Sequence, residues 1–583
     1  MADVGGASRR SSRRGSQRAQ TSQHSATRKS KSKTTTSRNR RQSTPRTRNV
    51  IKAQSCVSSL PTDLWTQLLP FLTWRGTDTM LCVCSEWRNV VNEAKKLHPE
   101  WHSTVLGPSA NGSESLELLR ANHLKWADTR FAPDLMLLSA ASGDSTPWQS
   151  GGYWEEAIAA IEEEKLLPSK CRIVGVFTMN AVLGESEEVE ERDTSSSAVT
   201  LSISLAHLPG TKVEMAEFDR KDLRRYHRGA ELENPFEEVE VGDTPSFWLF
   251  GVNDQSASQL VPAIQEWHPG AAVVGAVSPL VDRCVPLATY RGGDAAPVGR
   301  QERQRRKNKQ HLPQPPSRRR PRPRGQVAFP STMLLRLHGK IGLRTFSSSG
   351  YHPVTPVIRC ERASVAVEIT QVVTYDLVSM PNHEASAEAP QYRIMDLLEP
   401  VERLAIEQEG RGLNIFSCRE SAPLEHLVER CGTSQLKLPA PTSALIDRLE
   451  FVFWLQGGLM SLPGLCWQQG AYGVLASHQP TRAPHALTEA LQSTQADIVA
   501  SNERAFGAFL VAGALNEVED AVHATDVSKL CADMFQGLHF GGCIVSSSVG
   551  PVAFPGGLQL PAVTSIVQVQ THTTCGAILY TKV

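Results

Sequence analysis

The sequence predicts an α/β (α+β) fold with mixed sheets, preceded by a small all-α unit and a disordered basic tail. The main observation is a strand–helix–strand pattern that occurs twice. It lies at 134–141, 153–167 and 171–178, and again at 246–252, 257–267 and 271–278. Strands that alternate with helices are typical of layers in which helices cover a sheet. A chain of 583 residues is too long for one core, so we expect at least two folded domains.

The last third of the chain also alternates predicted helices and strands. It predicts a helix near 485–501, a strand at 507–515 and a helix around 526–535. A glycine-rich stretch with several short β runs then leads to the C-terminus. We expect this stretch to form the edge and the closing hairpins of a sheet.

Glycines recur inside the predicted strands. Gly175 and Gly275 each lie in a Val-Gly-hydrophobic run, and a glycine in a buried strand usually marks close approach of backbone or ligand. Near the C-terminus, glycines and a cysteine precede a run of serines. These residues predict either a small pocket for a carboxylate or amide ligand, or simply a turn between strands. The candidate pocket residues are Gly175, Gly275, Gly541, Gly542, Cys543 and Ser548.

Two segments are strongly basic. Residues 1–55 consist largely of Ser, Thr, Arg and Lys, and the first 52 residues carry a formal charge of about +14. Such a segment buries too little apolar surface to offset its ordering entropy, so we expect it to be disordered. Residues 299–325 form a proline-rich run of about +10, which predicts an extended, solvated loop or a nuclear-localisation signal. Since the formal net charge is +1, the remainder carries about −23, which disfavours nucleic acid as a partner.

Residues 60–91 predict a small helical unit. Leucines recur every four residues from Leu60 to Leu72, and Pro61 suits a first helical position. Pro70 predicts that this helix ends or kinks there. A turn is expected at 73–78 and a second helix at 79–95. Val83, Cys84, Trp87 and Val91 share one face of that second helix, which is a large apolar surface for so short a segment.

The cysteine usage and the apolar stretches indicate the compartment. The twelve cysteines include no CxxC pair, so we expect reduced thiols in the cytoplasm or nucleus, or both. The N-terminus has no apolar core typical of a secretory signal. Glycines and Pro463 interrupt the longest uncharged apolar stretch, 451–467, so we expect no membrane span.

The sequence lacks the motifs that usually carry chemistry. It contains no P-loop, no dinucleotide fingerprint after a strand, no nucleophile elbow and no HExxH zinc motif. The histidines, such as His478, His485, His523 and His539, show no metal-ligand spacing with Cys or Asp. We therefore expect a protein that is not an enzyme and that needs no cofactor or metal.

The helical unit resembles an F-box. That family has a Leu-Pro-x-Glu/Asp-Leu start, leucines at helical spacing and a Val-Cys-x-x-Trp-Arg run. This chain has Leu60-Pro61-Thr62-Asp63-Leu64 and Val83-Cys84-Ser85-Glu86-Trp87-Arg88, and it departs from the family at Pro70 and at Gly76-Thr77. The resemblance implies an F-box over 56–100 that binds a Skp-type adaptor and, through it, a cullin ligase core.

The rest of the chain resembles the FIST pair of domains. "CRIVGVFTMNAVLG", "KIGLRTFSSSGYHPVTPVIRC" and "GGCIVSSSVGPVAFP" occur in the order of that family's landmarks. In the last of these, Ser547-Ser548-Val549 stands where the family often has Gly-Glu-Ile, so an acidic residue is missing. The resemblance implies a FIST N-terminal domain at 128–345, with the insertion 299–325, and a FIST C-terminal domain at 346–583.

An F-box followed by FIST domains implies a substrate-recognition subunit of an SCF-type cullin ubiquitin ligase, whose FIST region binds an unknown protein substrate. The alternative is a sensory protein that binds a small molecule in the FIST pocket. The expected adaptor-binding residues are Leu60, Pro61, Leu64, Leu68, Leu72, Val83, Cys84, Trp87 and Val91. Periodicity alone equally allows this face to pack against the rest of the chain as ordinary core.

Overall fold

The computed structural model describes most of the chain after residue 73. The described residues are 64, 68–72, 74–121, 129–142, 148, 151–163, 167–168, 170–178, 182–184, 198–227, 232–236, 243–278, 285–291, 327–366, 372–379, 397–409, 413–418, 446–451, 453–455, 459–463, 470–513, 527–535, 537–552, 567–570 and 573–582. The predicted tail at 1–55, the insertion at 299–325, and Leu60 and Pro61 lie outside them. Residues 60–583 form one compact unit, which is described below.

The N-terminal helices differ from their predicted bounds. They are η1 (Leu69–Phe71), α2 (Trp74–Leu81) and α3 (Ser85–Leu97). Pro70 lies in the single 3₁₀ turn η1, after which Leu72 is extended, as the proline predicts. The predicted turn at 73–78 was wrong because residues 74–78 belong to α2. The predicted helix at 79–95 is broken before Ser85. The break follows from Cys84, whose extended backbone caps α3.

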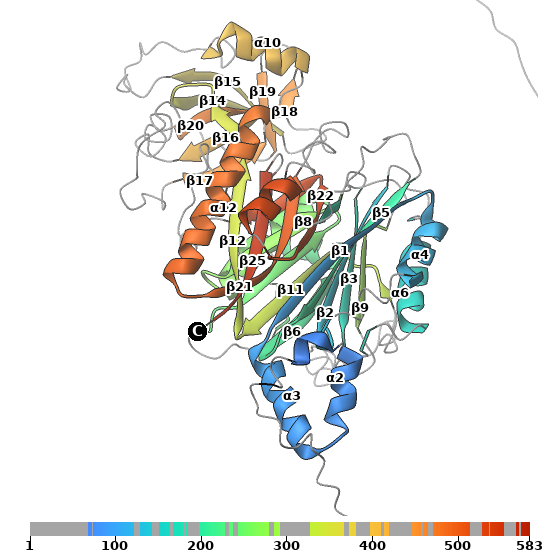
Figure 1. The fold of residues 1–583 in the computed structure, drawn as a ribbon. Coiled ribbons are helices and arrows are strands. Elements are labelled where there is room, and N and C mark those ends of the chain that lie inside the picture. The colour runs from blue at the N-terminus through green and yellow to red at the C-terminus, as the bar shows by residue number, and fades with distance from the viewer. Residues whose placement is uncertain are drawn as a thin grey trace, which may run out of the picture. The chain divides into compact units, whose positions relative to one another are not determined.

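Three repeats of one topology make up the body of the protein (Figure 1). The first comprises β1 (Glu100–Ser109), α4 (Gly112–Ala121), β2 (Leu135–Ser142), α6 (Gly152–Glu163), β3 (Arg172–Thr178), β4 (Val182–Gly184) and β5 (Val199–His207). The second comprises β6 (Thr211–Phe218), α7 (Arg220–His227), β7 (Ser246–Gly251), α8 (Asp254–Trp267), β8 (Ala272–Val277), β9 (Leu287–Arg291), β10 (Val327–Ala328) and β11 (Thr332–Gly339). The third comprises β12 (Ile341–Ser349), α12 (Ala483–Ala500), β21 (Arg504–Gly513), helical residues 527–534, β22 (Phe540–Val545), β23 (Ser547–Pro551), β24 (Val567–Gln570) and β25 (Thr573–Thr581).

Each repeat builds a mixed sheet. Its last strand lies antiparallel between the first two strands, as β5 does between β1 and β2, β11 between β6 and β7, and β25 between β12 and β21. The second and third strands are parallel and joined through a helix, as in β2–β3, β7–β8 and β21–β22. The predicted strand–helix–strand units are therefore confirmed, and they are parallel crossovers.

A short fourth strand of each repeat leaves its own sheet. β4 pairs with β22, β9 pairs with β3, and β23 pairs with β8, all antiparallel. Each exchanged strand thus completes the sheet of another repeat, and the exchange runs in a closed cycle through all three. The sheets consequently cannot separate without breaking strand pairing.

The sheets share one core and have separate outer cores. Inward side chains of all three sheets form a central cluster that includes Trp101, Trp248 and Phe509. On the outer faces, α4 and α6 cover the first sheet, α7 and α8 the second, and α12 with residues 527–534 the third. The predicted boundary at 345/346 falls inside β12, and the central cluster draws on residues from both sides of it.

An inserted region follows β12. It contains β13 (Tyr351–Pro353), β14 (Ile358–Ala366), β15 (Val372–Ser379), α10 (Pro400–Glu409), β16 (Leu413–Cys418), β17 (Ile446–Phe451), β18 (Phe453–Leu455), β19 (Leu459–Pro463), β20 (Tyr472–His478) and η5 (Pro480–Arg482). The hydrogen-bonded path runs β17-β16-β20-β14-β15-β19-β18. The two end strands of this path, β17 and β18, are consecutive in the chain, and all the pairings described in this sheet are antiparallel. None of the described helices is long and apolar enough to cross a membrane.

Candidate partner-binding site on the N-terminal helices

The inner face of the helical unit (residues 64–97) is part of the folded core. Val91 is fully buried and packs in a small cluster with Leu69, Met80, Ala94 and Phe131. Phe131 precedes β2, so this cluster joins the helices to the first repeat. The expectation that Val91 contacts an adaptor was wrong, because its side chain is enclosed by the protein itself.

Polar contacts hold the same face against the body. The Thr77 hydroxyl donates to the Arg130 carbonyl at 2.7 Å, and Arg130 forms an ion pair with the buried carboxylate of Glu100. On the other side, His207 Nε2 lies 3.3 Å from the Lys95 carbonyl oxygen. The ring of His207 also lies against Phe131, with 5.1 Å between ring centroids. These contacts fix the orientation of α2 and α3 on the first sheet.

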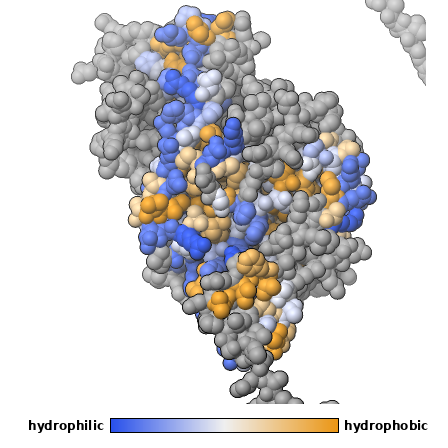
Figure 2. All heavy atoms as spheres, viewed as in Figure 1, coloured by the Kyte–Doolittle hydropathy of each residue, from blue (hydrophilic) through white to orange (hydrophobic). Residues whose placement is uncertain are grey.

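The outer face of the unit is apolar and open to solvent. Its exposed side chains are Leu64, Leu68, Phe71 and Val83, which we call the outer apolar surface. Phe71 is 85% exposed and Val83 is 56% exposed, which is unusual for side chains of this kind. Figure 2 shows hydrophobic atoms gathered over this part of the molecule. Several large apolar side chains exposed on one small helical unit are typical of a site of association with another protein.

Phe71 was missed by the sequence analysis. An unbroken four-residue leucine period assigns the outward position to Leu72. The 3₁₀ turn at Pro70 has three residues per turn, so it shifts the register, buries Leu69 and turns Phe71 outward. The proline before Phe71 is the signal that could have revealed this shift.

The remaining predicted contact residues lie at the edge of the outer apolar surface. Leu72, Cys84 and Trp87 are half-buried, and Leu72 and Trp87 pack on the inner cluster. Cys84 is the N-cap of α3, because its Sγ accepts a hydrogen bond from the Trp87 backbone N–H at 3.5 Å. Its role in this structure is therefore to begin α3, the helix that carries Trp87.

The glycines of the candidate ligand pocket lie in packed sheets. Gly175, Gly275 and Gly542 occupy corresponding positions in β3, β8 and β22, the third strands of the repeats. A Cβ at Gly175 would meet the Trp154 ring, and at Gly275 or Gly542 it would meet a backbone carbonyl of the paired strand. A Cβ at Gly541 would meet the Ser204 hydroxyl. Neighbouring protein atoms thus fill the space at these four positions.

The other two candidate pocket residues are also enclosed. Cys543 is fully buried in the central core, and burial raises the pKa of its thiol to about 12. Ser548 is fully buried, and its hydroxyl donates to the Thr573 carbonyl at 2.7 Å. The six residues come from three sheets. Ser548 lies on the strand paired with that of Gly275, and Gly541 to Cys543 are consecutive in β22, but each of these positions is filled by protein atoms.

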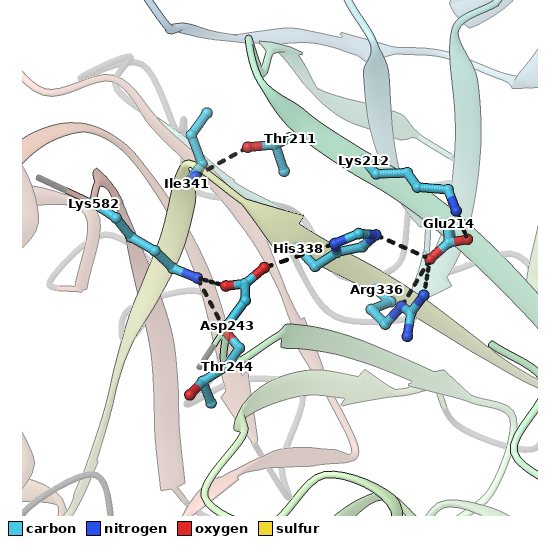
Figure 3. A network of polar contacts seen from close by, with 9 residues as sticks. All are labelled: Thr211, Lys212, Glu214, Asp243, Thr244, Arg336, His338, Ile341 and Lys582. Atoms are coloured by element: carbon cyan, nitrogen blue, oxygen red, sulfur yellow. Dashed lines mark hydrogen bonds and ion pairs between the residues drawn. The ribbon is translucent and has the colours of Figure 1, made fainter. Parts of the chain in front are cut away.

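A buried ionic network joins the second repeat to the end of the chain (Figure 3). Glu214 and Arg336 are both buried and form an ion pair, and Lys212 Nζ lies 2.7 Å from the same carboxylate. His338 lies between Glu214 and Asp243, and Lys582 Nζ contacts Asp243 at 2.7 Å. Each charged group here has an oppositely charged neighbour, so removing one partner would leave a buried charge unpaired. Among the described residues no group of three His, Cys, Asp or Glu side chains could hold a metal ion.

Comparison with known proteins does not assign the chain to a family. No family model matches it, and no curated protein matches it. The F-box and FIST resemblances therefore stay predictions that rest on the quoted motifs. The outer apolar surface is the feature of the described chain that most clearly indicates a binding function.

Proposed function

We propose that this chain is a substrate-recognition subunit of an SCF-type cullin ubiquitin ligase. The outer apolar surface would bind a Skp-type adaptor, and the FIST-like remainder would bind the protein to be ubiquitinated. Ubiquitin transfer would take place on partner proteins brought close to the substrate, so this chain would not be an enzyme. A cytoplasmic or nuclear location, or both, accords with the cysteines of the described residues, which are free thiols.

One observation carries the proposal. The same helical unit buries one face in the first repeat and leaves large apolar side chains in solvent, among them the outer apolar surface of Leu64, Leu68, Phe71 and Val83. Covering such side chains with a partner is favourable by roughly 25 cal/mol per Å² of apolar area. Because Thr77, Glu100 and His207 already fix the inner face, a partner would meet a rigid surface and lose little entropy on binding.

Co-purification of the full chain with a Skp-type adaptor tests the proposal. The variant Leu68→Ser/Val83→Ser removes two exposed apolar contacts and leaves the inner cluster intact. We expect a loss of about 2 kcal/mol in binding free energy, which is roughly 30-fold in Kd. Val499→Ser is the control, because Val499 is even more exposed than Leu68 or Val83 but lies on α12. Absence of adaptor binding by the wild-type chain would exclude the proposed function.

A further inference from the structure

The helix α7 of the second repeat is amphipathic, and its outward face is cationic. Leu223 is buried in the outer core of the second sheet, and Tyr226 packs against the same core. Four other side chains of the helix are exposed to solvent, and we call them the cationic face: Arg220, Lys221, Arg224 and Arg225. Residues four apart lie on the same side of an α-helix, so Arg220 is next to Arg224 and Lys221 is next to Arg225.

This arrangement of charges disfavours the helix itself. Both pairs four residues apart are like-charged, and like charges at this spacing destabilise a helix. Arg220 and Lys221 also lie in the first turn, where the helix dipole favours acids. Asp222 is the single acid of α7, and within the described part of the chain no ion pair joins the cationic face to a carboxylate. A local cost that no contact in the protein offsets is expected at a functional site.

The chemistry of the cationic face selects an anionic partner. Three of its four residues are arginines, whose guanidinium groups bind a carboxylate or a phosphate through two parallel N–H donors. Apart from its two basic segments, the chain carries about −23, so a long nucleic acid would be repelled beyond the face. A lipid surface is disfavoured because none of the large exposed hydrophobic side chains of the described residues lies on α7. A protein segment is the class of anion that these observations favour.

The length of the cationic face fits a short peptide. The eight residues of α7 extend about 12 Å. About four residues of an extended peptide span this length, at roughly 3.3 Å per residue. Four carboxylates, or two phosphates of nearly two charges each, would match the charge of the face. Because Leu223 holds α7 against the second sheet, the cations are carried by an ordered helix and the binding of a partner costs little entropy.

We propose that the cationic face of α7 binds a short acidic segment of a partner protein, with carboxylates or phosphates as its anionic groups. The inference rests on the proposed function in one respect, because it names this segment as the feature of the substrate that the ligase subunit recognises. The cationic face shares no residue with the outer apolar surface, which lies before the first repeat, so each can be tested separately. Because the cations are exposed, affinity falls as salt rises.

Fluorescence anisotropy with the full chain tests this inference. The probe is a labelled peptide with four consecutive glutamates between Gly-Ser flanks, and the comparison peptide has glutamines in their place. A third peptide with two phosphoserines distinguishes phosphate from carboxylate recognition. We expect the glutamate peptide, the phosphoserine peptide or both to bind roughly 10-fold more tightly than the glutamine peptide. Equal affinity of all three peptides would overturn the proposal.

Neutralising one like-charged pair tests whether α7 is the site. Lys221→Gln/Arg225→Gln should weaken binding of the acidic peptide roughly 5-fold. The variant removes a like-charge repulsion, so its urea midpoint should not fall below that of the wild type. Lys170→Gln/Arg504→Gln is the matched control, because it neutralises two exposed cations in the other repeats and should change the Kd little. Equal affinity of wild type and Lys221→Gln/Arg225→Gln would show that the peptide binds elsewhere.

Zero-length coupling locates the bound peptide. A water-soluble carbodiimide joins a carboxylate to a lysine amine that it contacts, so we expect the glutamate peptide to couple to Lys221. Coupling to lysines of 1–55 or 299–325 instead would show that the basic segments bind the peptide, and it would overturn the proposal. Coupling of Lys221 to the chain's own Glu237 or Glu238 in the absence of peptide would also overturn it, because the chain itself would then cover the face.

Adaptor co-purification with the same preparations separates this inference from the proposed function. Adaptor binding without binding of either acidic peptide would overturn only the inference about α7. Binding of an acidic peptide at Lys221 without adaptor binding would exclude the ligase function, and α7 would remain a site for an acidic segment of another partner.

Discussion

The hydroxyl of Ser278, just after β8, donates a hydrogen bond to the backbone carbonyl of Phe177 in β3. The same contact recurs around the three repeats: Thr178 donates to the Ile544 carbonyl and Ser546 donates to the Val277 carbonyl. Each hydroxyl lies at the end of β3, β8 or β22, or directly after it, and donates to a carbonyl in one of the other two of these strands. The cycle ties the carboxyl ends of β3, β8 and β22 together, in addition to the exchange of short strands.

Removing one of these hydroxyls should destabilise the whole body. Ser546→Ala leaves the buried Val277 carbonyl without its 2.8 Å partner, which costs about 1–2 kcal/mol. We expect urea denaturation to show this loss in the free energy of unfolding. The variant should still unfold in a single cooperative transition. Ser113→Ala, at an exposed position in α4, is the control and should change stability little. A wild-type midpoint for Ser546→Ala would show that the cycle adds nothing to stability.

Adding a methyl group to a strand glycine distinguishes packing from a ligand pocket. In Gly542→Ala the new Cβ meets the Leu510 carbonyl of the paired strand, so we expect a loss of about 2 kcal/mol or more. Gly152→Ala is the matched control, because nothing lies within 4 Å of a Cβ there and alanine favours the helix α6. If Gly542→Ala were as stable as wild type in thermal unfolding, open space beside β22 would have to exist.

The hydrophobic periodicity of the sequence predicted most of the helices and strands, but it did not predict how the strands pair into sheets. The strand–helix–strand patterns near Leu135 and Ser246 correspond to observed crossovers, and α12 matches the helix expected at 485–501. The exchange of β4, β9 and β23 could not be predicted, because strand partners far apart in sequence leave no local signal. For the same reason the boundary at 345/346 was set by motif order and falls inside β12.

The candidate site was partly predictable. Leu64, Leu68 and Val83 were expected on an apolar face and are exposed, whereas Val91 on the same expected face is buried. The difference arises at Cys84, whose capping contact breaks the helix and rotates α3 relative to α2. Side-chain capping by a cysteine is an uncommon signal, so the sequence pattern favoured one continuous helix.

Acid should destabilise the protein through His268. Burial, together with the nearby Arg336 and His338, lowers the pKa of His268 to about 4 from its usual 6.5. The unfolded chain therefore takes up the proton first, and stability falls as the pH drops from about 6.5 toward 4. We expect His268→Gln to flatten this part of the curve of unfolding free energy against pH. Identical slopes for wild type and His268→Gln would rule out this contribution.

Variants of Val91 on the inner face and of Val83 on the outer face should distinguish the roles of the two faces of the helical unit. Val91→Ala removes buried methyl groups from the cluster around Leu69 and Phe131, so we expect a loss of about 2 kcal/mol in unfolding free energy. Val83→Ala truncates an exposed side chain, so unfolding should change by less than about 0.5 kcal/mol. In adaptor titrations at a temperature where both variants are folded, the order should reverse, with Val83→Ala weakening binding and Val91→Ala nearly unchanged. Weaker adaptor binding by Val91→Ala than by Val83→Ala would mean that the partner approaches the inner face, which requires the contacts of Thr77 and His207 with the body to open.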